Sequence, residues 1–310
     1  MKRDYAAPAV FPPPPDPWPE LRPKLAPELG RRALAVAVPM VEETLSAESA
    51  LSLESLRRRA LGVDRYLVVP QSLRLGWPHD DFQVLRVPDA AMSSIAAYNR
   101  LMLTPWFYRL FAGYDSLLIF QTDCLLLRDD LADWAAQGWS YVGAPWFARK
   151  RGMRLKAVGN GGLSLRRPAD ALAVLQAERF HWRPRLGQQI RHFASFKHLG
   201  LLRRTLAAAR RDVALEPLGA RFVRHFARPE DEFWGQYAPF FHPGFRIPSP
   251  AAALDFAFEP RPADCLKLNG GRAPLGCHAW AKMDRAFWLG FLAERDPSLL
   301  EVLQAQQPGV

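Results

Sequence analysis

Residues 33–39 read Ala-Leu-Ala-Val-Ala-Val-Pro, an apolar run of the length of one β-strand. A strand that is apolar on both faces is typical of a parallel sheet covered by helices on its two sides. The pattern predicts a helix over 41–60, which begins with residues that favour helix starts, and two further strands over 65–69 and 82–87. The order strand, helix, strand predicts an α/β protein with a doubly wound, mostly parallel sheet flanked by helices.

Similar patterns predict the elements further along the chain. A helix is expected over 90–103, and a second, short one from Pro105, with Thr104 as its cap. The other expected elements are a strand at 117–120, a strand at 141–146, a glycine turn with a strand at 158–167, strands and loops over 212–280, and two helices within 284–306 parted by Pro297.

The composition of the 310 residues predicts a cytoplasmic protein. Three cysteines match no zinc-binding spacing and are too few for a disulfide scaffold, which favours a reducing compartment. The longest apolar run, 33–41, is shorter than the roughly 20 residues of a membrane-spanning helix. Residues 1–30 are rich in proline where a secretory signal would be apolar. We therefore expect a proline-rich tail over 1–30, one domain over 31–290 and a helical tail over 291–310.

The positive charge is concentrated in one stretch. Residues 179–211 hold nine basic residues and no acidic one, while the rest of the chain holds 32 basic and 31 acidic residues. We expect this basic insert to form two helices divided at Gly200. In the second helix one face carries Arg203, Arg204, Arg210 and Arg211, and another carries Leu202, Leu206 and Ala209. Such an amphipathic helix suits an anionic membrane surface. Aromatic residues are not interleaved with the basic ones as in nucleic-acid-binding modules, so no nucleic-acid partner is expected.

Gln121-Thr122-Asp123 follows the apolar strand Leu-Leu-Ile-Phe at 117–120. Ligands of open parallel sheets bind at the carboxyl ends of strands, so this polar triplet is well placed for chemistry. A carboxylate held between two apolar segments suits a divalent cation that bridges a diphosphate. An ordinary turn is the alternative interpretation, because Asp is common where strands end.

Gly159-Asn160-Gly161-Gly162 is a glycine-rich turn. No Lys-Ser or Lys-Thr follows, so it is not a P-loop, and it does not open a helix after a first strand, as a dinucleotide-binding motif does. The glycines permit either a close approach of the backbone to a ligand or a tight hairpin.

Three carboxylates, Glu230, Asp231 and Glu232, precede an aromatic pair that includes Trp234. A carboxylate pair beside an apolar wall suits a general base, and a solvated acidic turn is the alternative. His278 is either a metal ligand or a satisfied core histidine. Trp146 and Trp234 are candidates for stacking on a sugar face, and burial in the core is the alternative for both.

Six segments taken together resemble a bacterial domain-of-unknown-function family regarded as glycosyltransferases of the GT-A fold. They are YNRLMLTPWFY, LLIFQTDCLLL, YVGAPW, VGNGGLSLRR, PEDEFWG and GCHAW, in this order between residues 33 and 282. The order is similar to the GT-A core: a metal-binding Asp-x-Asp, a glycine loop, an acidic motif and a late histidine.

The resemblance implies a Rossmann-like, GT-A-like fold and a role for each matching residue. Asp123 and His278 would be ligands of a Mn²⁺ or Mg²⁺ cofactor, and Asp231, or else Glu230, would be the catalytic base. Gln121 departs from the pattern, because it stands where the first Asp of Asp-x-Asp is expected. The glycine loop, with Asn160, Gly161 and Gly162, would bind the donor sugar, and Gln121 and Thr122 would also bind the donor. Independently of the resemblance, the end of the first strand, with Val38, Pro39 and Glu42, is expected to meet the nucleoside, as strand-end loops do in doubly wound sheets.

The expected function is transfer of a sugar from a nucleotide-diphosphate donor to a hydroxyl of a glycan or glycolipid, as in cell-surface polysaccharide or lipopolysaccharide synthesis. Direct displacement assisted by Asp231 would invert the anomeric centre. Trp234 and the four arginines of the insert would face the acceptor or a membrane, with peripheral association at the inner membrane face. The alternative is a non-catalytic protein that binds a membrane surface or an anionic ligand through its basic insert.

Overall fold

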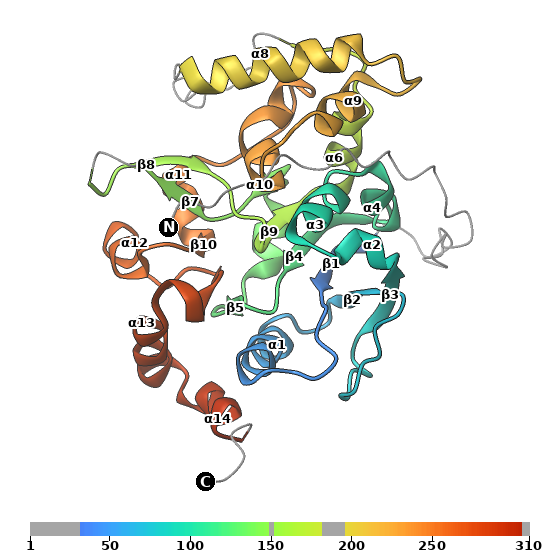
Figure 1. Cartoon of the computed structure of the whole chain (residues 1–310). Helices are drawn as coiled ribbons and strands as arrows, with labels where there is room; N and C mark the ends of the chain where they lie inside the picture. Colours follow the sequence, from blue (N-terminus) through green and yellow to red (C-terminus); the bar gives the residue numbers. More distant parts are fainter. Residues whose placement is uncertain (1–31, 149–151, 182–195, 306–310) are drawn as a thin grey trace.

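The computed structural model describes residues 32–148, 152–181 and 196–305 (Figure 1). Its centre is a six-stranded sheet with the strand order β3-β2-β1-β4-β9-β6. These strands are β1 (Arg32–Pro39), β2 (Asp64–Pro70), β3 (Gln83–Val87), β4 (Tyr114–Phe120), β6 (Tyr141–Val142) and β9 (Leu163–Arg166). The first four are mutually parallel, and β9 alone runs antiparallel to its two neighbours. The prediction of an α/β protein with a mostly parallel sheet is confirmed.

The sheet is held by a large apolar core. Ala35–Val38 of β1 and Leu117–Phe120 of β4 are fully buried, in keeping with central strands that have elements packed on both faces. The helices around the sheet are α1 (Ala47–Arg59), α2 (Asp89–Met92), α3 (Ile95–Leu101), α4 (Pro105–Leu110), α5 (Leu131–Ala136), α6 (Pro168–Leu175), α8 (Phe196–Arg211) and α9 (Leu218–Arg224).

A second apolar cluster lies beside the first, around Trp280 and Trp288. It is built from a small sheet of β5 (Leu125–Leu126), β10 (Ala257–Phe258) and β11 (Gly276–Cys277), and from α13 (Trp280–Arg295) and α14 (Pro297–Ala305), which also packs on α1. The remaining elements are the hairpin β7 (Pro145–Phe147) with β8 (Leu155–Val158), α10 (Glu230–Glu232), the π-helical turn Phe233–Tyr237, the 3₁₀ turn Ala238–Phe240, α11 (Pro250–Phe256) and α12 (Pro262–Leu268).

Hydroxyl caps set several helix starts. Thr104 accepts a hydrogen bond from Phe107 N at the start of α4, as predicted. The helix expected over 41–60 begins only at residue 47, because the Ser46 side chain caps α1 by accepting from Ser49 N. The helix expected over 90–103 is two helices, since the Ser94 side chain caps α3. At both sites the hydroxyl cap determines where the helix begins, and the periodicity of the apolar residues does not.

Three further predictions are wrong in their local structure. Residues 212–280 contain α9 to α12 and two helical turns between their loops, where only the two-residue strands β10 and β11 match the expected strands. The strand expected over 141–146 is split between β6 and β7. Helix α8 runs through Gly200 without a break. A glycine inside a helix costs about 1 kcal/mol, and the packing of the apolar face of α8 on α9 offsets that cost.

Within the described ranges, no helix combines the length and the apolar character that crossing a bilayer requires. The proline-rich segment 1–30, residues 182–195 of the basic insert and the last residues of the C-terminal tail lie outside the described residues.

Candidate functional site

Strand pairing brings the predicted site segments together at one edge of the sheet. Ala37 of β1 pairs with Ile119 of β4, and Phe120 pairs with Leu163 of β9. The segments 39–42, 121–123 and 159–162 therefore meet where these strands begin or end. Thr122 Oγ1 donates to Glu42 Oε1 across 3.3 Å, and Glu42 also accepts from Ser49 Oγ at 2.7 Å. Glu42 thus fixes the loop after β1 against the loop after β4.

Four polar side chains form what we call the strand-end cluster: Gln121, Asp123, Glu259 and His278. His278 Nε2 lies 3.3 Å from Asp123 Oδ1 and 3.2 Å from Gln121 Oε1. On the other side of the ring, His278 Nδ1 lies 3.1 Å from Glu259 Oε1. The small sheet delivers two of these residues, since Glu259 follows β10 and His278 follows its parallel neighbour β11.

The donor atoms of the strand-end cluster fit a divalent cation. Ligands at right angles on an ion with bonds of about 2.1 Å lie about 3 Å apart, close to the two distances around Nε2. Asp123 Oδ1 is shielded from solvent, and apart from its ion pair with His278 Nε2 it makes no hydrogen bond to any described residue. Glu259 behind Nδ1 is the arrangement that orients a metal-binding imidazole. Gln121 contributes an amide oxygen in place of the expected carboxylate.

Cys124 lies within 4.8 Å of Asp123 and His278 but does not suit the same ion. Its Sγ donates to Gly162 O at 3.2 Å, and burial raises the pKa of the thiol well above its usual value. The hydrogen bond to Gly162 O and the complete burial of the side chain indicate a packing role for Cys124 in the core.

The pKa values in the strand-end cluster reflect its acidic surroundings. Burial by itself would lower the pKa of His278, but hydrogen bonds and charges from Asp123 and Glu259 raise it to about 10. Burial by itself would raise the pKa of Asp123, but the neighbouring His278 lowers it. Without a cation the imidazolium therefore neutralises part of the two carboxylate charges.

The glycine turn packs tightly against protein side chains. A Cβ at Gly159 would lie 1.9 Å from the Trp146 ring, and one at Gly162 would lie 2.2 Å from the His278 ring. A Cβ at Gly161 would lie 2.2 Å from Glu230 Oε1. None of these three glycines has a positive φ. Their absent side chains make room for Trp146, His278 and Glu230, so close packing explains these glycines and turn geometry does not.

Asn160 supplies the left-handed residue of the turn, with φ at 80°. Its Oδ1 accepts from Gly162 N at 3.0 Å, which closes the turn on itself. Its buried Nδ2 has no partner among the described residues. A buried donor without a partner is costly, so Nδ2 is a candidate contact for a bound ligand.

Asp231 of α10 lies against this turn. Its Oδ2 accepts from Asn160 N at 3.0 Å, and its Oδ1 accepts from Glu232 N at 2.9 Å. Burial, and then the charge of Glu230, raise the pKa of Asp231 to about 7. A carboxyl that titrates near neutral pH suits a general base.

Glu230, one residue earlier, forms a buried ion pair with Arg166 of β9. Arg166 Nη2 donates to Glu230 Oε1 at 2.9 Å, and both side chains are 2% exposed. Arg166 also donates to Tyr108 Oη at 2.9 Å and to Ser164 Oγ at 3.0 Å. These contacts give Glu230 a structural role beneath the turn.

Burial corrects two predicted contacts. Trp234 was expected at the acceptor or membrane side, but it is 1% exposed, packs against Tyr108 and donates from Nε1 to Met102 O. The structure supports the alternative interpretation, in which Trp234 is buried in the core. The side chain of Val38 is fully buried in the sheet, so it cannot contact a donor. Arg203, Arg204, Arg210 and Arg211 are all exposed on α8, as the predicted amphipathic pattern requires.

Sequence patterns did not identify Glu259 and Arg166. Glu259 follows a strand of two residues, too short to be seen as apolar periodicity. Arg166 reads as part of an ordinary Leu-Arg-Arg strand end. The one available signal was the position of Glu259 between an apolar segment and Pro260, which marks the end of a strand.

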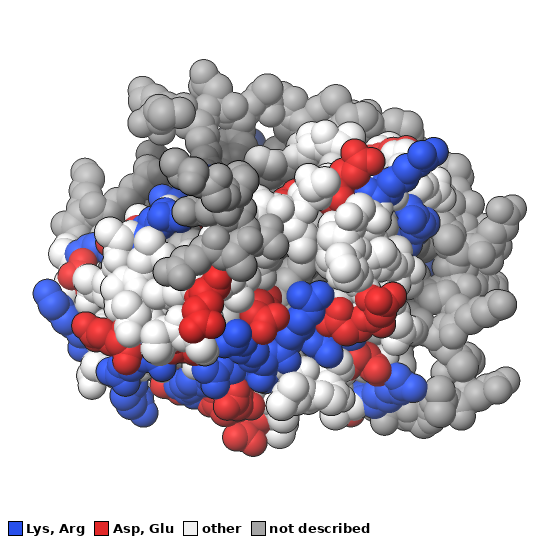
Figure 2. All heavy atoms as spheres, turned by 90° about the horizontal axis from the view of Figure 1, so that it is seen from below, with Lys and Arg blue, Asp and Glu red and all other residues white. Residues whose placement is uncertain are grey.

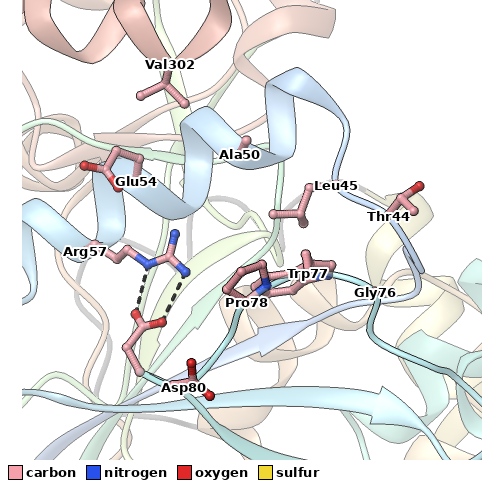
Figure 3. A pocket seen from close by; sticks show the side chains of 11 residues that line it. Thr44, Leu45, Ala50, Glu54, Arg57, Gly76, Trp77, Pro78, Asp80 and Val302 are labelled. Carbon is pink, nitrogen blue, oxygen red and sulfur yellow. Dashed lines mark hydrogen bonds and ion pairs between the residues drawn. The ribbon is translucent and has the colours of Figure 1, made fainter. Parts of the chain in front are cut away.

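A groove of about 690 Å³ opens between α1, with the two residues Thr44 and Leu45 before it, and the loop that joins β2 to β3 (Figure 3). Leu45, Trp77 and Pro78 line its apolar part, and a two-bond ion pair between Arg57 and Asp81 lines its polar part. No member of the strand-end cluster lines it, so it is a feature separate from the candidate metal site.

Comparison with known proteins finds similar solved structures and one matching protein family. Among 72 matching chains of solved structures are the apo WbbM bifunctional glycosyltransferase (13% identity, TM-score 0.43) and the galactosyltransferase LgtC in complex with donor and acceptor sugar analogs (10%, 0.42). The match covers 90% of this chain and 53% of the WbbM chain, so the protein spans about half the length of that chain. For the LgtC complex the shares are 89% and 97%, and for an active-site mutant of LgtC (12%, 0.42) they are 85% and 95%. No curated protein matches. Residues 81–278 match the family described as protein of unknown function DUF5672, and the chain belongs to that family.

Proposed function

We propose that this protein is a metal-dependent glycosyltransferase with a GT-A-like fold, which transfers a sugar from a nucleotide-diphosphate donor to an acceptor hydroxyl. The observation that carries the proposal is the convergence of Gln121, Asp123 and His278 at the strand ends, next to a carboxyl, Asp231, with a pKa of about 7. A cation site and a general base beside one turn are the two parts that such a displacement needs.

The strand-end cluster would hold the cation and, with it, the diphosphate of the donor. Asp123 Oδ1, His278 Nε2 and Gln121 Oε1 would be its protein ligands, with Mn²⁺ or Mg²⁺ as the ion. A bound divalent cation would neutralise the negative charge that develops as the nucleoside diphosphate departs. The Asp123 side chain is 48% exposed although its Oδ1 is shielded, so a donor can approach from the solvent side.

The turn 159–162 would position the donor sugar. Asn160 Nδ2 would donate to a donor oxygen, because it is buried and has no partner among the described residues. The ion pair of Glu230 with Arg166 holds α10 under the turn, which keeps Asp231 within reach of the same space.

Asp231 would act as the base. Its carboxylate takes the proton of the acceptor hydroxyl, and the oxygen attacks the anomeric carbon while the bond from that carbon to the diphosphate oxygen breaks. Attack on the side opposite the leaving group inverts the anomeric centre. Glu230 is excluded from this role on our assignment, since its Oε1 is held by Arg166 inside the core.

The acceptor would be a hydroxyl of a glycan or glycolipid, which is the substrate class of cell-surface polysaccharide or lipopolysaccharide synthesis. The competing candidate is a protein that binds an anionic surface without catalysis, favoured by the exposed arginines of α8. Turnover of a nucleotide sugar separates the two, because only the enzyme releases a nucleoside diphosphate.

The test is a thermal-shift screen of nucleoside diphosphates and nucleotide sugars, with and without Mn²⁺, followed by assay of released nucleoside diphosphate. A ligand at 100 times its Kd stabilises the protein by about 2.7 kcal/mol. We expect stabilisation by at least one nucleotide only with Mn²⁺, and its loss in Asp123→Ala and in His278→Ala. Asp129→Ala is the matched control, since Asp129 is 69% exposed and lies outside the cluster. Mn²⁺-independent binding that survives both cluster substitutions would refute the metal site, and absence of any turnover would favour the binding protein.

A further inference from the structure

Helix α8 presents a cationic face to solvent. Arg203, Arg204, Arg210 and Arg211 are exposed and form no ion pair with any described residue. The opposite face, Leu202, Leu206 and Ala209, is 3% exposed or less and packs against the body of the protein, where α8 contacts α9. The arginines therefore cannot turn inward, and their charges remain available to a partner.

The loop after α8 adds two exposed aliphatic side chains. Val213 is 95% exposed and Leu215 is 105% exposed, the two highest values among the exposed large hydrophobic residues in the described part of the chain. Fully burying such a side chain typically stabilises a protein by about 1.5–3 kcal/mol. Two exposed aliphatic side chains next to four arginines are therefore an unusual combination.

Side-chain contacts hold this loop in place. Arg221 Nη1 donates to the backbone oxygen of Asp212 at 2.7 Å, and Ala214 N donates to Asp212 Oδ1 at 3.1 Å. Arg224 donates to Asp212 Oδ2 at 3.1 Å and also pairs with Glu216. Arg224 thus pairs with both acidic residues that flank the exposed aliphatic pair, Asp212 and Glu216, so their charges are compensated and do not repel an anionic partner.

The side of the molecule opposite α8 does not repeat this charge pattern. Figure 2 shows the side of the molecule on which α1 and α14 lie, and there acidic and basic side chains are intermingled. In Figure 1, α8 lies at the opposite end of the molecule from α14. The described residues thus carry exposed arginines on α8 at one end and intermingled charges at the opposite end.

We propose that α8 and the loop 212–217 dock the protein on an anionic lipid bilayer. The four arginines contact lipid phosphates, and Val213 and Leu215 enter the boundary between head groups and acyl chains. The exposed aliphatic pair decides in favour of a bilayer over a nucleic acid, since a phosphate backbone offers no apolar phase for it. The proposal rests on a surface separate from the strand-end cluster and stands or falls independently of the transferase activity.

The experiment is sedimentation of the full chain with vesicles of phosphatidylcholine alone or mixed equally with phosphatidylglycerol. We expect binding to the anionic vesicles only, weakened steeply by added salt. Each of the changes Arg203→Gln, Arg204→Gln, Arg210→Gln and Arg211→Gln should lower the affinity about fivefold. Val213→Ser combined with Leu215→Ser should lower it about tenfold or more while the four charges remain.

Matched controls come from other faces of the molecule. Leu61 is 77% exposed beyond the end of α1, so Leu61→Ser should leave binding unchanged, and so should Arg272→Gln. Insertion is read directly from Val213→Cys labelled with an environment-sensitive dye, because the three native cysteines are buried. We expect a blue shift of the dye on anionic vesicles.

Three results would overturn the proposal. The first is equal vesicle binding by the protein without the four arginines. The second is full binding by the Val213 and Leu215 double variant with no blue shift of the dye, and in that case tight binding of a duplex oligonucleotide would point to a nucleic-acid surface. The third is an equal loss of binding in the Leu61→Ser control.

Discussion

The buried ion pair of Arg166 with Glu230 makes the two adjacent carboxylates, Glu230 and Asp231, separable by experiment. Both partners of the pair are 2% exposed, and the Arg166 guanidinium has further fixed contacts to Tyr108 and Ser164. Glu230→Gln keeps the shape and removes the charge, which leaves a buried guanidinium without a counter-ion. Breaking a buried pair in this way costs roughly 3–5 kcal/mol.

That loss is a large part of the net stability of a folded protein, which is about 5–15 kcal/mol. For a chain of this size each 1 kcal/mol corresponds to about 2 °C in Tm, so Glu230→Gln should lower Tm by roughly 6–10 °C. Differential scanning calorimetry measures the shift. Glu54→Gln is the control, because the pair of Glu54 with Arg58 is partly exposed and such pairs contribute about 0.3–0.5 kcal/mol.

A double-mutant cycle completes the test. Arg166→Met alone should be as damaging as Glu230→Gln, while Arg166→Met combined with Glu230→Leu should melt no lower than either single variant, since an apolar pair can replace a buried ion pair. Transfer activity per folded molecule should survive in Glu230→Gln. A Tm within about 1 °C of the unaltered protein, or strictly additive losses in the double variant, would refute the structural role of Glu230.

Four shorter predictions concern Asp231, His278 and two glycines. Asp231→Asn should cut transfer about 10²–10⁴-fold, and the rise of rate with pH up to about 7 should disappear from the pH–rate profile. The raised pKa of Asp231 also means that the folded state holds one more proton than the unfolded state between about pH 4 and about 7. The free energy of unfolding therefore falls as pH rises through that window. Urea titrations at several pH values should show this slope in the unaltered protein and a shallower slope in Asp231→Asn. Because the pKa of His278 is raised to about 10, Mn²⁺ must displace a proton from the imidazole when it binds. Calorimetry should therefore find one proton released per Mn²⁺ and tighter binding as pH rises toward 10. Binding that does not depend on pH would contradict His278 as a ligand. Gly161→Val should lower Tm by clashing with Glu230, whereas Gly200→Ala, with open space around it, should raise stability by about 0.5–1 kcal/mol, and equal thermal effects of the two changes would show that the turn is not packed as described.

The central sheet could be predicted from the sequence because its strands are apolar on both faces. Residues 33–39 and 117–120 are apolar throughout, and residues 34–38 and 117–120 are buried in the sheet. The 212–280 region could not be predicted in the same way. Its helices are short, several begin at proline, and their apolar residues are aromatic clusters whose partners lie far away in the sequence.

The site was predictable where a strand end delivers the residue and unpredictable where tertiary contacts do. Asp123 and the turn 159–162 follow from strands that the apolar pattern marks. The pairing of His278 with Asp123 required the resemblance to a family, since 155 residues of chain separate them. The roles of the glycines depend on which side chains fill the space in front of them, and no local pattern carries that information.

The arrangement of charge around His278 gives a physical reason for the unusual Gln121. A cation held by two carboxylates and a histidine would receive two negative charges directly. On our proposed assignment Asp123 would supply one charge directly, and Glu259, 3.1 Å from His278 Nδ1, would supply the second through the imidazole. The second carboxylate would thus lie behind the histidine ring, where it makes Nε2 a stronger electron-pair donor to the ion. The neutral amide of Gln121 would then occupy the ligand position in which a carboxylate was expected. Glu259→Gln should therefore weaken Mn²⁺ binding about 10–100-fold, the effect of losing a carboxylate that supports a histidine ligand, although Glu259 would not touch the ion. Isothermal titration of Mn²⁺ measures this change, and Glu259→Gln with unaltered affinity would show that the charge behind His278 does not compensate for Gln121.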